Sequence, residues 1–178
     1  DSLAYHKMVS GIFSSILFRG ALIALIAWLL KDYIGFLFKQ PQLQHFPDYG
    51  FACIVTGLGR AINITAAALF RNEKKVLSFI LVSMGLGVFR TGFQLIGLFY
   101  FDMSFIGYIN GSAIGTAIVS VLILVAIYTK SGFGFDRKMM REINRFAMPL
   151  TQYSVIVWVL TYADRYMLER FPADLGIY

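Results

Sequence analysis

The stretch KSGFGFDRKMMREINR, residues 130–145, determines how the rest of this chain is expected to be arranged. It lies between long apolar segments, and its charges are strongly biased toward the positive sign. Its basic residues are Lys130, Arg137, Lys138, Arg141 and Arg145, against only Asp136 and Glu142. Lys and Arg in short loops stay on the cytoplasmic side of a membrane, so this run predicts which side of the chain is inside.

The second half of the same stretch has the pattern of an amphipathic helix. Asp136 is placed to cap its start, while Met139, Met140, Ile143 and Phe146 fall at helical spacing and the charges take the other face. Such a helix would lie at the lipid headgroups and join two halves of a larger protein. The alternative is a solvated basic loop.

The composition of the chain favours an integral membrane protein. Of 178 residues, 58% are hydrophobic and 15% charged, with a mean hydropathy of +0.67. Lipid can solvate this apolar excess, whereas one small globule cannot bury it. The net charge of +6 is concentrated in short segments, so it predicts orientation and not nucleic-acid binding. The single Cys53 excludes an intramolecular disulfide, and its spacing from His6 and His45 suggests no metal site and no cofactor.

Five apolar segments are long enough to cross a bilayer as helices, which takes about 20 residues each. We therefore predict an all-α membrane fold with five transmembrane helices, at about 8–30, 50–70, 76–99, 105–128 and 147–168. With residues 130–145 inside, nine basic residues fall in inside loops and four in outside loops. The first helix therefore starts in the cytoplasm, and both 71–75 and 130–145 are cytoplasmic.

Three arginines, Arg19, Arg60 and Arg90, lie within predicted spans. A mid-span Arg costs about 2.5–3.5 kcal/mol on insertion scales, so each needs a partner or water. No Asp or Glu lies well inside the first four spans. Three explanations are open: a water-filled cavity that accepts an anion, pairing with carboxylates outside this chain, or side chains that extend to the interface.

Other side chains could complete an anion site around these arginines. Asn63 shares the stripe of Arg60, and Gln94 shares the stripe of Arg90. Guanidinium groups have forked donors that match phosphate oxygens. Tyr162, Trp158 and Tyr153 offer flat faces on which sugars stack, although packing and interface anchoring are the commoner roles of such aromatics.

The fourth span carries Gly107, Gly111 and Gly115 at intervals of four, a spacing that lets two helix backbones approach closely. A second small series, Ser112, Thr116 and Ser120, lies beside it, and we interpret both as packing features. The chain shows no nucleophile–base pair and no glycine-rich phosphate loop. We therefore predict no catalytic residues, and a protein that is not an enzyme.

The linker and the fifth span resemble a known family. The sequences RFAMPL (145–150), ADRYML (163–168) and GIY (176–178) resemble the seventh helix of polysaccharide-biosynthesis flippases, the O-antigen and capsule type. These belong to the multidrug/oligosaccharidyl-lipid/polysaccharide exporter superfamily. The turn 71–75 and the glycine-rich fourth span also resemble this family's fourth loop and sixth helix.

The resemblance implies two pseudo-symmetric lobes around a central cationic cavity, in a bundle of about twelve to fourteen helices. On this match the chain is expected to be an internal piece of a longer protein. Residues 1–129 would be helices three to six of the N-terminal lobe, 130–146 the cytoplasmic linker, and 147–178 the first helix of the C-terminal lobe with its following loop.

The resemblance also implies a function. The protein would flip a lipid-linked oligosaccharide across a bacterial or archaeal cytoplasmic membrane by alternating access. Its partners would be an undecaprenyl-pyrophosphate-linked glycan, the bilayer, and a polysaccharide polymerase and glycosyltransferases. A multidrug antiporter of the same fold and a non-transporting membrane scaffold are the alternatives.

The predicted topology can be tested by single-cysteine labelling of the full-length protein after Cys53→Ser. An impermeant thiol reagent should label Asp102→Cys in intact cells, and Lys138→Cys only after permeabilisation. Labelling of position 138 but not position 102 in intact cells would contradict the orientation.

Overall fold

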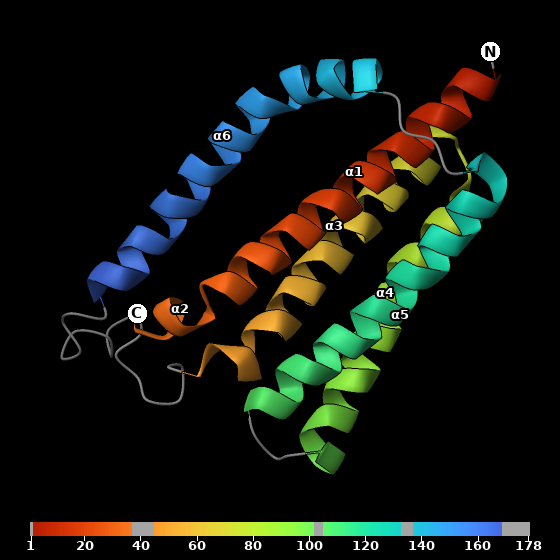
Figure 1. The fold of residues 1–178 in the computed structure, drawn as a ribbon. Helices are drawn as coiled ribbons and strands as arrows, with labels where there is room; N and C mark the ends of the chain where they lie inside the picture. The colour runs from red at the N-terminus through yellow and green to blue at the C-terminus, as the bar shows by residue number, and fades with distance from the viewer. Residues whose placement is uncertain (1, 37–44, 102–104, 133–136, 169–178) are drawn as a thin grey trace. The chain divides into compact units, whose positions relative to one another are not determined.

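The structure, a computed structural model, describes residues 2–36, 45–101, 105–132 and 137–168. All regular structure in these residues is helical, which confirms the predicted all-α class. The elements in chain order are α1 (Ser2–Leu29), α2 (Lys31–Phe36), η2 (Phe46–Asp48), α3 (Gly50–Asn72), α4 (Val76–Ile96), η3 (Gly97–Phe101), α5 (Phe105–Ser131) and α6 (Arg137–Leu168) (Figure 1).

Four helices are long and apolar enough to cross a membrane, as judged over the part of the chain that the structure describes. They span Ala4–Leu29, Gly50–Asn72, Val76–Tyr100 and Phe105–Ser131, close to the first four predicted segments. The fifth predicted segment, 147–168, lies entirely within α6. Its passage through the membrane stays a prediction.

Helix α6 differs from the expectation of an interfacial helix followed by a separate span. It is one continuous helix from Arg137 to Leu168, with Pro149 in its interior. A proline within a helix removes one backbone hydrogen bond and clashes with the preceding turn, which either bends or ends the helix. Figure 1 shows α6 bending along its length.

The chain divides into two compact units, residues 1–135 and 136–178. The first unit is built around α3 and α5, which pack against each other. Both α1 and α4 contact each member of this pair but make no substantial contact with one another. They therefore lie on opposite sides of the α3–α5 pair.

The α4–α5 contact is a contact between backbones. A Cβ atom at Gly111 would collide with the carbonyl oxygen of Phe93, and one at Gly115 would lie 2.5 Å from the carbonyl oxygen of Phe89. Near η3, a Cβ at Gly97 would collide with the carbonyl oxygen of Gly107. The structure thus places the glycine series of α5 against α4, where only glycine allows this approach.

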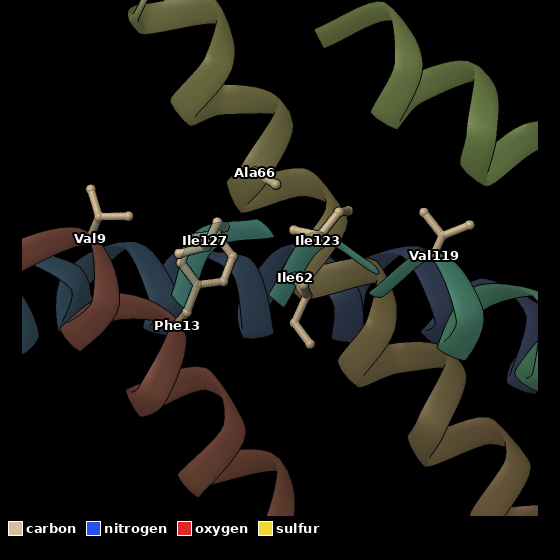
Figure 2. Packing of buried hydrophobic residues seen from close by; sticks show 7 residues of the cluster. All are labelled: Val9, Phe13, Ile62, Ala66, Val119, Ile123 and Ile127. Carbon is tan, nitrogen blue, oxygen red and sulfur yellow. The ribbon is translucent and has the colours of Figure 1, made fainter. Parts of the chain in front are cut away.

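A second close approach joins α3 to α5. A Cβ at Gly59 would lie 2.5 Å from the Thr116 Cγ2 atom and 2.8 Å from the Ser120 Oγ atom. Beside it, apolar side chains from α1, α3 and α5 form the core of the unit (Figure 2). The buried members are Val9, Phe13, Ile62, Ala66, Val119, Ile123 and Ile127.

The turn between α3 and α4 is closed by backbone hydrogen bonds. The Lys75 N–H donates to the Phe70 carbonyl and the Lys74 N–H to the Arg71 carbonyl, while Lys74 has a φ of 57°. This is the Schellman pattern, with lysine in the left-handed position that glycine usually takes. The pattern satisfies carbonyl groups at the end of α3 and reverses the chain within three residues.

Side chains tie α1 to this turn. The Tyr5 hydroxyl donates to Glu73 Oε1 at 2.6 Å, and Lys75 Nζ lies 2.7 Å from Glu73 Oε2. Burial alone would raise the pKa of Glu73. The hydrogen bonds from Lys75 and Tyr5, with the charges of Lys75 and His6, outweigh burial and lower that pKa below its ordinary value.

Gly111→Ala should destabilise the protein, because its Cβ forces α4 and α5 apart. Overpacking of this kind costs about 1–3 kcal/mol, so the unfolding temperature in detergent should fall by several degrees. Gly87→Ala is the matched control, since a Cβ there meets no atom within 4 Å. Equal unfolding temperatures for the two variants would contradict the backbone contact.

The Glu73 contacts should make stability depend on pH. A carboxylate whose pKa is lowered by folding stabilises the folded state above its ordinary pKa of about 4.3, and the effect is lost as pH falls through the folded value. At neutral pH the free energy of unfolding of the wild type should exceed that of Glu73→Gln by about 0.2–1 kcal/mol. This difference should vanish in acid, where Glu73 is protonated. Thermal unfolding across a pH series measures this, and a pH-independent difference would show that the charge of Glu73 is irrelevant.

Candidate functional site

Arg90 is half-buried on α4 and is anchored to α5. Its Nε donates a hydrogen bond to the Ser112 Oγ at 3.0 Å, and Ser112 is itself buried. The backbone is held as well, because a Cβ at Gly115 would lie 2.8 Å from the Arg90 Cα. The guanidinium group therefore has a defined position, set by two small residues one turn apart on α5.

Arg60 is exposed on α3 and lies on the same side of the central pair as α4. On α3, Leu58 contacts α1 at Gly20, while Gly59 contacts α5. Successive residues of an α-helix are rotated by about 100° around its axis. Leu58 and Arg60 therefore lie on opposite sides of the direction in which Gly59 faces α5. Since α1 and α4 lie on opposite sides of the pair, the side away from α1 is the side of α4.

Arg60 and Arg90 also lie at similar depth along the bundle. Gly59 lies against Thr116 and Ser120, and Arg90 lies against Gly115. Residues 115–120 of an α-helix span about 7.5 Å, which limits the difference in depth between the two arginines to roughly that length. The structure thus brings two mid-span arginines to one side of the α3–α5 pair.

Arg19 does not share this side. Arg19 is exposed on α1. Its neighbour Gly20 contacts Leu58, which lies two residues before Arg60 on α3, so Arg19 and Arg60 lie at similar depth. Because α1 and α4 lie on opposite sides of the central pair, Arg19 is separated from Arg90 by α3 and α5.

Asn63 lies within the α3–α5 contact. It is 2% exposed, and its Nδ2 donates to the Gly59 carbonyl at 2.8 Å and to the Ser120 Oγ at 3.0 Å. Ser120 in turn donates to the Thr116 carbonyl at 2.7 Å. Asn63 is therefore used to join two helices, and this position removes most of its side chain from any open cavity.

Gln94 is also buried, one turn beyond Arg90 on α4. Its Cα would lie 3.0 Å from a Cβ at Gly111, so it belongs to the α4–α5 contact. Trp158 and Tyr162 lie on α6, and their side chains fall outside the described residues.

Sequence reasoning missed the role of the series Ser112, Thr116 and Ser120. All three side chains are buried on one face of α5, where Ser112 receives the Arg90 hydrogen bond and Ser120 receives that of Asn63. The spacing of four was visible in the sequence, but nothing in the sequence identified the partners on other helices. This series is the polar counterpart of the glycine series on the same helix.

The charge in the four candidate spans has a single sign. They contain Arg19, Arg60 and Arg90, together with basic residues near their ends, but no Asp or Glu. Among the described residues, no three His, Cys, Asp or Glu side chains are grouped as metal ligands would be. The arrangement is therefore suited to an anion.

An open groove of about 360 Å³ lies between α3 and α5. Its lining is mostly apolar and includes none of the predicted site residues. The lining residues are Phe51, Ala52, Val55, Asn110, Ala113, Ile114 and Ala117.

The chain was compared with protein families, with curated proteins and with solved structures. The family model described as polysaccharide biosynthesis protein matches residues 3–178, which is nearly the whole chain. Searches of curated proteins and of solved structures each returned no match. The several apolar helices and the family match together indicate a multi-pass membrane protein. The chain belongs to the polysaccharide biosynthesis protein family.

Proposed function

We propose that this protein moves a lipid-linked oligosaccharide, a precursor of a polysaccharide, across the cytoplasmic membrane. The glycan would be carried on an undecaprenyl pyrophosphate, and Arg60 and Arg90 would contact its phosphates during passage through a cationic cavity. Transport by alternating access requires no chemical step, so the protein would not be an enzyme. The glycosyltransferases and the polymerase that make and use such a glycan are its expected partners.

The observation that carries this proposal is the pair of mid-span arginines on the α4 side of the α3–α5 pair. Arg60 is exposed and Arg90 is half-buried, and the four candidate spans contain no acidic residue. An unneutralised guanidinium at this depth is costly in lipid, and an anionic ligand with water would relieve that cost. The forked donors of arginine match the oxygens of a diphosphate.

The same observation favours a flippase over a multidrug antiporter. Antiporters that export cations need carboxylates in the membrane to bind their cargo, and these four spans provide only positive charge. A scaffold without transport activity would need neither sign of charge within its spans. The arginines are thus better explained by an anionic cargo than by either alternative.

Replacing the arginines in the full-length protein tests the proposal. Arg60→Ala and Arg90→Ala should each reduce glycan export about ten- to a hundredfold, the loss expected for one charged hydrogen bond, while expression and unfolding temperature change little. Arg60→Lys and Arg90→Lys should retain part of the activity, and clearly less than wild type if forked phosphate contacts matter.

Thr65→Ala serves as a control on α3, since the Thr65 hydroxyl donates to the Ala61 carbonyl one turn earlier on the same helix. Arg19→Ala shows whether the site extends to α1. Full export by the Arg60→Ala/Arg90→Ala double variant at normal expression would overturn the cationic-cavity proposal.

A further inference from the structure

Exposed basic residues from three separate segments gather at one end of the first unit, where α1 begins, α3 turns into α4, and α5 ends. We call this set the basic collar. It consists of Lys7, Arg71, Lys74, Lys75 and Lys130.

Contacts between side chains show that these segments lie side by side. The Tyr5–Glu73 hydrogen bond of 2.6 Å joins the start of α1 to the α3–α4 turn. His6 Nδ1 lies 3.2 Å from the Ser131 Oγ, which joins α1 to the end of α5. Lys7 follows His6, and Lys130 precedes Ser131, so the basic residues of the collar surround one small area.

The collar is strongly positive. Its five basic residues face one carboxylate among the described residues at this end, Glu73, which leaves a net charge of five minus one, or +4. Glu73 is already engaged by Lys75 and Tyr5. At the opposite end, Lys31 is offset by Asp32 and Asp48. The charge asymmetry therefore belongs to the folded unit and not only to the sequence of its loops.

The position of the collar limits what it can bind. It sits at the ends of four apolar helices that are long enough to cross a membrane, which is the depth of the lipid headgroups. The anions concentrated at that depth are lipid phosphates, and each basic residue near such a surface strengthens binding about fivefold.

We propose that the basic collar binds the phosphate groups of membrane lipids. This inference rests on the proposed function, in which the relevant lipid is the diphosphate-bearing carrier. The collar would hold that carrier at the cytoplasmic entrance before its headgroup reaches Arg60 and Arg90. Bulk anionic phospholipid offers the same chemistry. The test compares these two sources directly.

The test measures lipid binding to the purified full-length protein in neutral detergent, with no transport readout. Short-chain fluorescent phosphatidylglycerol should bind and phosphatidylcholine should not, with binding weakened by added salt. The triple variant Arg71→Gln/Lys74→Gln/Lys130→Gln leaves the Lys75–Glu73–Tyr5 contacts in place. It should bind phosphatidylglycerol about a hundredfold more weakly, at about fivefold per charge.

Lys31→Gln, at the opposite end, is the matched control and should bind like the wild type. Displacement of phosphatidylglycerol by undecaprenyl diphosphate at much lower concentration would support recruitment of the carrier. Equal potency would support the collar as a general anionic-lipid site. Unchanged affinity in the folded triple variant, or equal binding of phosphatidylcholine by the wild type, would overturn the proposal.

Because the readout is binding, its failure is distinguishable from failure of the flippase proposal. If the collar variant loses lipid binding and Arg60→Ala/Arg90→Ala keeps full export, the collar proposal is supported and the cationic-cavity proposal is overturned. If the collar variant keeps lipid binding and the arginine double variant loses export, the cationic-cavity proposal is supported and the collar proposal is overturned.

Discussion

The first unit depends on the close approach that small residues allow on two sides of α5. On one side, Gly111 and Gly115 bring the backbone of α4 into contact, and on the other, Gly59 of α3 receives Thr116 and Ser120. In lipid, helices gain little from burying apolar surface against one another, so packing and interhelical hydrogen bonds hold them together. The central place of α5, the opposite placement of α1 and α4, and the position of Arg90 all follow from these contacts.

The polar residues of α5 show how a membrane helix can be both a packing element and a support for charge. Ser112 orients Arg90 on one neighbouring helix, and Ser120 binds Asn63 on the other. Each hydroxyl satisfies a donor that would otherwise be unpaired in an apolar medium, where an unmet polar group is costly. The hydroxyl groups therefore fix side-chain positions without adding charge to the interior.

Much of the fold was predictable, because span length and the spacing of small residues are properties of continuous sequence. The four spans, the turn after α3 and the small-residue face of α5 all have local signatures. The continuity of α6 through Pro149 was missed, since a proline bends or ends a helix depending on what surrounds it. For the site, the sequence identified the arginines as unusual residues. It did not show that Arg60 and Arg90 share a side while Arg19 lies across the central pair, because that depends on helix rotation and neighbours.

The tight turn between α3 and α4 has a consequence for how the protein is made. The hydrogen bonds that close this turn, with Lys74 in the left-handed region, reverse the chain between α3 and α4 and make the two helices one hairpin. Each helix of that hairpin carries an arginine, Arg60 on α3 and Arg90 on α4, that disfavours partition into lipid by about 2.5–3.5 kcal/mol. In a hairpin that inserts as one unit, the apolar length of both helices offsets the cost of each arginine, and the backbone N–H groups of Glu73, Lys74 and Lys75 are hydrogen-bonded at the turn. We therefore expect this turn to let two helices that each carry a costly charge enter the bilayer together.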